Sequence, residues 1–368
     1  MGGINLRPPL KLRWSYEGVK SFAFEESHQT VVVCLFPDGL ACLDLNGEEK
    51  WKVNGQYAEN LIIPRDEAFA IDANGSLLHI DLQTGNVKKT PFGPGSLVFV
   101  STDGRSAISI AFKHDQTQQT YESFVVRRAL VGDDHQQWKR EQTGSLQENL
   151  AFISASTVRG ALLFVAKRSA RLLCLSIETG DILWDADVNQ SKPDANLGVA
   201  ADLRVAPLVS GSIVLAPTPF GFGAFRIETG ELLWRHGVHA GPFNVYKDRL
   251  YMATGINFTG YRIVDMNTGE TLFQREVSDD IAKTYRFAYV KLNSGFAITE
   301  SHTFVGDNFG RLWALERDTG EPVWYHHPKG AVPYVALRQP VILGNRLYIN
   351  GFSTDPNRPQ HLYCYEQT

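Results

Sequence analysis

Hydrophobic and polar residues alternate along much of this chain, and a Thr-Gly or Asn-Gly pair breaks the alternation at intervals. Alternation with a period of two predicts β-strands with one buried face, and a glycine between two such strands predicts a tight hairpin. This unit of strand, turn and second strand recurs clearly at residues 171–188, 223–238, 260–277 and 311–328, and more weakly at residues 40–53 and 77–92.

A bulky aromatic residue follows the turn glycine by four positions in most copies. Side chains alternate across a strand, so this aromatic residue reaches the same face in every copy. We expect it to wedge between neighbouring sheets, where one aromatic side chain buries about 150–250 Å². The pairs are Gly47 and Trp51, Gly180 and Trp184, Gly230 and Trp234, Gly269 and Phe273, and Gly320 and Trp324, while the same step from Gly85 reaches Lys89.

A lone sheet of four strands cannot cover both of its faces, and radial stacking of such sheets removes the problem. Beyond the six copies above, a degenerate seventh at residues 123–140 has Asp134 in the glycine position, four residues before a tryptophan. The eighth is split: residues 361–368 have the pattern of the strand before a turn, and residues 10–18 that of the strand after it.

We therefore predict an all-β fold, an eight-bladed β-propeller of four-stranded antiparallel blades that forms a single domain over residues 1–368. The N-terminal strand is expected to pair with the C-terminal strands and close the ring. Seven blades is the alternative, and it would make the copy at 77–92 or the copy at 123–140 an insertion.

The repeat resembles the PQQ-like (quinoprotein-type) family of β-propellers, which are WD40-like repeat proteins. The matching pieces are the Leu-x-Ala-Leu-Glu-x-x-Thr-Gly-Glu-x-x-Trp unit at 312–324 and the related segments 206–217 and 339–350. The resemblance covers essentially the whole chain and points to the non-enzymatic branch, similar to the propeller of the outer-membrane β-barrel assembly lipoprotein. It implies no cofactor, and PQQ itself is not expected, because quinoprotein dehydrogenases carry an adjacent Cys-Cys pair and this chain has none.

Charge and motifs exclude several function classes. The net charge is −4 and no Lys- or Arg-rich run occurs, which excludes a broad nucleic-acid-binding surface. No GxSxG elbow, P-loop or HExxH motif is present. His236 and His326 each follow a repeat tryptophan by two residues, so repeat ancestry explains them without a metal. We predict no catalytic, cofactor-binding or metal residues, and the four cysteines are expected to be free buried thiols.

The N-terminal residues contain no apolar stretch typical of a signal peptide, and no segment has about 18 consecutive apolar residues. We therefore predict a soluble bacterial protein that is cytoplasmic as written, or periplasmic if a signal peptide has been removed, with no membrane insertion.

The loops point to one face of the predicted disc. The Thr-Gly turns are uniformly short, whereas the long insertions fall on the opposite face, which we call the long-loop face, and binding residues are usually carried on such loops. Aromatic and arginine side chains dominate binding hot spots, although Phe287 and Tyr289 equally fit an inner-strand core. The predicted partner-binding residues are Tyr285, Arg286, Tyr289, Asp194, Asn196, Lys329 and Tyr334.

The leading functional hypothesis is a non-catalytic scaffold that binds a protein partner through the long-loop face, as an assembly subunit, a sensor or a toxin-immunity protein, with a monomer favoured. One alternative is an envelope scaffold resembling the outer-membrane assembly lipoprotein. The other is a small-molecule or glycan binder or enzyme with a site in the central channel, which the largely apolar inner segments disfavour.

Overall fold

The strands of a computed structural model follow the repeat closely. The residues described are 6–25, 29–35, 39–55, 61–64, 66–72, 74–93, 96–101, 105–115, 120–130, 136–145, 157–159, 162–167, 171–187, 207–218, 221–236, 240–255, 258–287, 290–292, 294–328, 336–337, 339–352 and 360–368.

Two compact units divide the chain: unit 1 comprises residues 1–22, 31–52 and 238–368, and unit 2 comprises residues 23–30 and 53–237. The described residues form eight antiparallel sheets. The four that lie wholly or mostly in unit 1, in order of neighbouring strands, are β2 (Val19–Glu25), β3 (Thr30–Leu35), β4 (Gly39–Asp44) and β5 (Glu49–Asn54); β21 (Ala240–Tyr246), β22 (Arg249–Thr254), β23 (Gly260–Asp265) and β24 (Thr271–Glu276); β25 (Ala297–Ile298), β26 (His302–Gly306), β27 (Leu312–Glu316) and β28 (Pro322–His326); and β29 (Ala336–Leu337), β31 (Arg346–Phe352), β32 (His361–Gln367) and β1 (Leu10–Glu17), with β30 (Val341–Leu343) also paired to β31.

The sheets of unit 2 have the same strand order. They are β6 (Glu67–Ile71), β7 (Ser76–Asp81) and β8 (Val87–Pro91); β9 (Ser96–Val100), β10 (Ser106–Asp115), β11 (Thr120–Ala129) and β12 (Gln136–Ser145); β13 (Thr157–Arg159), β14 (Leu162–Lys167), β15 (Arg171–Ser176) and β16 (Ile182–Asp187); and β17 (Leu208–Ser210), β18 (Ile213–Thr218), β19 (Gly221–Arg226) and β20 (Leu232–His236). The prediction of four-stranded antiparallel sheets is confirmed.

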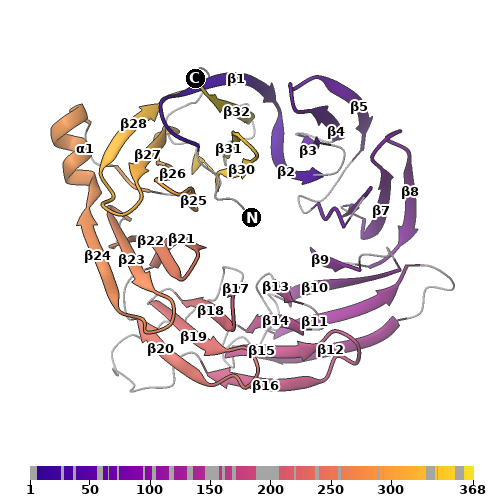
Figure 1. Ribbon diagram of the computed structural model, residues 1–368. Coiled ribbons are helices and arrows are strands. Elements are labelled where there is room, and N and C mark those ends of the chain that lie inside the picture. The colour runs from indigo at the N-terminus through magenta and orange to yellow at the C-terminus, as the bar shows by residue number, and fades with distance from the viewer. Residues whose placement is uncertain are drawn as a thin grey trace. The chain divides into compact units, whose positions relative to one another are not determined.

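The split copy forms one sheet, as predicted. Strand β1 pairs antiparallel with β32, from Leu10 opposite Gln367 to Glu17 opposite His361, and Figure 1 shows β1 beside the C-terminus. A bulge between Leu12 and Trp14 shifts the register. The degenerate copy at 123–140 is also a true repeat, because it falls on the paired strands β11 and β12.

Short polar contacts fix the turns that follow an aspartate. Asp265 Oδ1 accepts the backbone N–H groups of Asn267 at 2.8 Å and Thr268 at 2.9 Å. Asp81 accepts the equivalent N–H groups of Gln83 and Thr84. Such donors stabilise the charged carboxylate, and the pKa of both carboxyl groups is lowered, chiefly by the threonine N–H.

Aromatic rings wedge against the turn glycine of the neighbouring sheet. The indole Nε1–H of Trp138 donates to the Ile177 carbonyl at 2.8 Å, and a methyl group added at Gly180 would lie 2.6 Å from the Trp138 ring. Trp14 over Gly47 and Trp184 over Gly230 repeat the contact. Tyr261 of β23 takes this place over Gly320, and its hydroxyl donates to the Arg317 carbonyl at 2.6 Å.

Residues 277–285 form a helix, α1 (Val277–Tyr285), where the sequence predicted an insertion between blades. Val277, Ile281 and Tyr285 recur every fourth residue and turn inward, with Val277 and Ile281 fully buried. The helix contacts β23 and β28, and Figure 1 shows it beside β24 and β28. In the described part of the chain, no helix is long and apolar enough to cross a membrane.

All four cysteines are buried and free. Burial raises the pKa of the Cys174 thiol to about 12 and that of Cys364 to about 11, so neither is a thiolate at neutral pH. These thiols act as small apolar side chains of the strands.

The wedge makes a prediction about stability. Replacing Gly180, whose φ is +71°, with alanine adds left-handed strain and a clash with Trp138. We expect Gly180→Ala to lower the free energy of unfolding by about 2–5 kcal/mol. Gly211 has a φ of +58° and nothing within 4 Å of an added Cβ, so Gly211→Ala should cost only about 1–2 kcal/mol. Denaturant-induced unfolding of both variants measures the difference, and equal losses would refute the wedge.

Candidate protein-binding surface

Helix α1 ends on an aromatic cluster that belongs to the sheet β25–β28. The Tyr285 ring meets Trp313 edge-on at 5.3 Å and Tyr325 edge-on at 5.3 Å between centroids. Its hydroxyl donates to the Pro322 carbonyl at 3.3 Å, and burial raises the pKa of this phenol. The last turn of the helix is therefore fixed to the sheet by packing and by one hydrogen bond.

A buried guanidinium lies among the rings that follow the helix. Arg311 is 6% exposed, and its guanidinium carbon lies 4.0 Å from the centroid of the Phe287 ring, 4.8 Å from that of Phe309 and 5.6 Å from that of Trp313. Cations are attracted to aromatic faces, by about 2 kcal/mol or more when desolvated. These contacts attach the segment after α1 to the turn between β26 and β27.

Asp307 neutralises that buried charge. Its carboxylate is fully buried and accepts Arg311 Nε–H at 2.6 Å and Trp313 Nε1–H at 2.8 Å on one oxygen. The other oxygen accepts the backbone N–H groups of Phe309 at 2.8 Å and Arg311 at 3.0 Å. Arg311 Nη2 is enclosed and has no hydrogen-bond acceptor among the described residues. A buried ion pair of this kind is stable only while both partners are present.

Asp72 occupies the equivalent turn of the sheet β6–β8. It accepts the N–H groups of Asn74 and Ser76 as Asp307 accepts those of Phe309 and Arg311. Its other oxygen meets Lys89, whose side chain is 54% exposed. The repeat therefore places a small serine where the sheet β25–β28 buries an arginine, and aligning the two copies would have singled out this position.

The structure places two of the predicted partner-binding residues. Tyr285 is half-buried in the cluster, and Arg286 is exposed at the helix end with a left-handed φ of 58°. Phe287, which the alternative reading placed in an inner strand, is half-buried against Arg311 but lies outside any strand. The remaining predictions, Tyr289, Asp194, Asn196, Lys329 and Tyr334, lie outside the described residues.

The chemistry of this surface suits contact with another protein. It combines aromatic rings, a guanidinium and an exposed arginine, the residue types that dominate protein–protein hot spots. Over the described ranges, no group of three or more His, Cys, Asp or Glu side chains is arranged to hold a metal ion.

Comparison with known proteins relates this architecture to one family. The PQQ_2 family model, described as outer membrane protein assembly factor BamB, matches residues 86–255 and 260–360. A protein of that name from Burkholderia pseudomallei is 25% identical over 309 residues, covering 79% of this chain and 72% of that protein. Three further relatives with the same name are matched over less than half of their own length.

Solved structures agree in fold. BamB from Moraxella catarrhalis has a TM-score of 0.71 at 14% identity, covering 97% of this chain and 100% of that chain. A quinohemoprotein alcohol dehydrogenase from Comamonas testosteroni has a TM-score of 0.68 at 12% identity, covering 97% of this chain and 76% of that one. The likeness shows an all-β propeller with four-stranded antiparallel blades, and the predicted resemblance to PQQ-like repeat propellers is confirmed.

The prediction of a cytoplasmic protein is wrong. It rested on the N-terminal residues alone, whereas the four curated relatives are all named outer membrane protein assembly factors. The repeat architecture, which runs through the chain, is the stronger indicator, because the N-terminal residues carry no information on the partners of the fold.

The Asp307–Arg311 pair can be tested by removing one charge and then both. Asp307→Asn leaves the guanidinium buried without its counter-charge and should cost about 3–5 kcal/mol of unfolding free energy. Adding Arg311→Met should recover most of this loss. Asp72→Asn is the matched control, and it should cost less because Lys89 stays half-exposed to water. Urea unfolding measures all three, and a double variant no more stable than Asp307→Asn would contradict the account.

Proposed function

The chain belongs to the PQQ-like repeat family described as outer membrane protein assembly factor BamB, and from this premise we propose that it is a non-catalytic, protein-binding propeller that serves outer-membrane protein assembly. The observation that carries the proposal is the family match, which runs through most of the chain. The shared name of the curated relatives supports the same role.

We assign the partner contact to the surface around the end of α1. Arg286 lies exposed beside aromatic side chains that are already held in place by Trp313 and Arg311. A surface that is rigid before binding loses less entropy when it orders a partner, which favours affinity. The predicted contacts Tyr289, Asp194, Asn196, Lys329 and Tyr334 belong to the same proposal, as does a monomeric chain.

The proposed role needs no cofactor. The dehydrogenase neighbours share only the fold at 12% identity, and fold alone does not carry activity. This chain lacks the adjacent cysteine pair that the resemblance to quinoprotein dehydrogenases would require. The four cysteines present are buried in strands, apart from one another in sequence.

Deleting the gene in the native host tests the assembly role. We expect the amount of folded β-barrel protein in the outer membrane to fall, and the wild-type chain to restore it. The measurement is the heat-modifiable mobility of outer-membrane proteins on gels, which separates folded from unfolded barrels. Unchanged levels of folded barrels after deletion would reject the role.

Arg286 tests the proposed surface. Asparagine tolerates the left-handed backbone, so Arg286→Asn removes the charge without adding strain. We expect this variant to restore barrel assembly at least threefold less well than wild type at equal abundance. Arg226→Asn removes an exposed arginine of β19 and is the control. If both variants restored assembly fully, the partner contact would lie elsewhere, while the assembly role itself would stand on the deletion result.

A further inference from the structure

A cavity of about 320 Å³ opens between two neighbouring hairpins of unit 1. Its lining is residues 246–249 of the β21–β22 turn, together with Tyr251, Arg317 and Asp318. Arg317 and Asp318 belong to the Thr-Gly turn between β27 and β28. The cavity thus lies on short turns, apart from the α1 surface, and is large enough for a group the size of an amino-acid side chain.

The β21–β22 turn departs from the repeat at one position. Three hairpins reverse over two residues: Ser210 pairs with Ile213, Leu343 with Arg346, and Tyr246 with Arg249. The first residue of the reversal is Gly211 with a φ of +58°, Gly344 with a φ of +58°, and Lys247 with a φ of +54°.

Lysine is a costly residue at that position. A left-handed backbone suits glycine, and a side chain there adds strain that folding alone would not select. An added Cβ at Gly211 or Gly344 meets nothing within 4 Å, so the turn itself has no use for a side chain. Strained residues concentrate where a side chain is needed for a task. The cavity wall supplies a task for Lys247.

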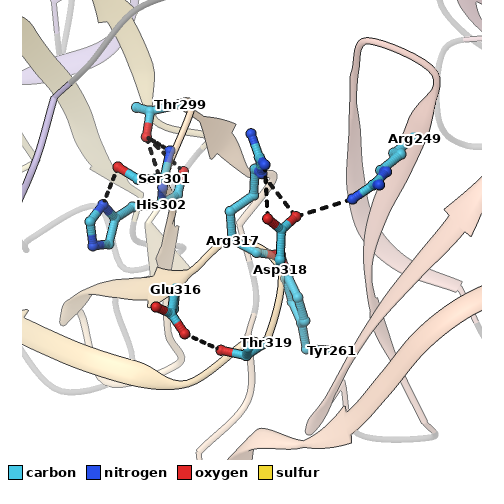
Figure 2. Close-up of polar contacts among 9 residues, drawn as sticks. All are labelled: Arg249, Tyr261, Thr299, Ser301, His302, Glu316, Arg317, Asp318 and Thr319. Atoms are coloured by element: carbon cyan, nitrogen blue, oxygen red, sulfur yellow. Dashed lines mark hydrogen bonds and ion pairs between the residues drawn. The ribbon is translucent and has the colours of Figure 1, made fainter.

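The cations of the cavity are arranged around one carboxylate. Asp318 accepts Arg317 Nη2–H at 2.8 Å and Nε–H at 3.1 Å, and Arg249 Nη1–H reaches it from the neighbouring hairpin at 3.1 Å. Figure 2 shows both guanidinium groups pointing at Asp318. The guanidinium of Arg317 holds the pKa of that carboxyl below its usual value. Arginine has five N–H donors, and Asp318 takes one of those of Arg249.

Lys247 adds a charge that this network does not use. Its ammonium lies 5.2 Å from the centroid of the Tyr246 ring, and no described residue forms an ion pair with it. Arg317 lies 5.6 Å from the same ring. The turn bearing Arg317 is itself fixed, because Tyr261 donates to the Arg317 carbonyl and Thr319 donates to Glu316 at 2.6 Å, as Figure 2 shows.

We propose that this cavity binds a carboxylate group of a polypeptide, an acidic side chain or a C-terminal residue, with Lys247 and Arg249 as its anchors. The lining carries three cations, Lys247, Arg249 and Arg317, against the carboxylates of Asp248 and Asp318, and so has room for one further negative charge. That charge balance fits a carboxylate better than a phosphate dianion. Asp318 already demonstrates the geometry, since two arginines share one carboxylate there.

Titration with four probes at low salt tests the site. The probes are acetyl-Gly-Glu-Gly-amide, acetyl-triglycine with a free C-terminus, the neutral acetyl-Gly-Gln-Gly-amide, and inorganic phosphate. Chemical shifts of the full chain in NMR spectra report binding. We expect at least one carboxylate peptide to bind and the glutamine peptide not to bind, and the stronger of the two carboxylate peptides identifies the source. Absence of binding by both, or stronger binding of phosphate, would overturn the proposal.

Lys247→Gly separates binding from folding. Restoring the repeat glycine should leave the thermal unfolding midpoint unchanged or raise it, while the dissociation constant of the carboxylate peptide rises at least tenfold. Lys247→Arg, which keeps the charge, should bind within threefold of wild type. Arg226→Gln in β19 removes an exposed, ion-paired arginine outside the cavity and should change nothing. Unchanged binding by Lys247→Gly would refute the assignment of the anchor.

Discussion

An aromatic ring placed on a glycine of the next sheet is the contact on which the rest of each unit depends. At Trp184 the ring covers the turn at Gly230, the missing Cβ leaves it room, and the indole N–H satisfies the Ile227 carbonyl at 2.8 Å. Because the ring and the glycine come from different sheets, the contact fixes the height of each sheet relative to its neighbour. The loops and turns that carry the candidate surfaces take their positions from this packing.

The repeat could be predicted from the sequence because its signals are local. A glycine and an aromatic residue four positions later are visible without any tertiary information, and the period of two fixes the face. Helix α1 was not visible, because residues 277–295 lie between two copies and follow neither pattern. Tyr285 was interpreted as a contact residue, whereas spacing by four from Val277 and Ile281 turns it toward the sheet. The burial of Arg311 depends on Phe287 and Phe309, whose approach only the fold reveals.

Departures from the repeat mark the positions that do something besides folding. Arg311 replaces the small residue that Ser76 represents in the equivalent turn, and Lys247 replaces the glycine of Gly211 and Gly344. Each substitution costs stability, one through a buried charge and one through a strained backbone. Within a repeat protein the other copies serve as internal references, so such costs can be recognised without comparing homologues. Function on this scaffold is written as exceptions to a regular rule.

The pairing of β1 with β32 has a consequence in time. Arg13 and Glu366, which meet across this pair, are 353 positions apart in the chain. At typical synthesis rates, the first strand waits roughly 20–70 s before its partner is made. Throughout that interval β1 has an unpaired edge, open to any passing strand. For a chain whose relatives attend to unfolded barrels, the protein itself begins life as the kind of exposed β-edge that a cell must shield.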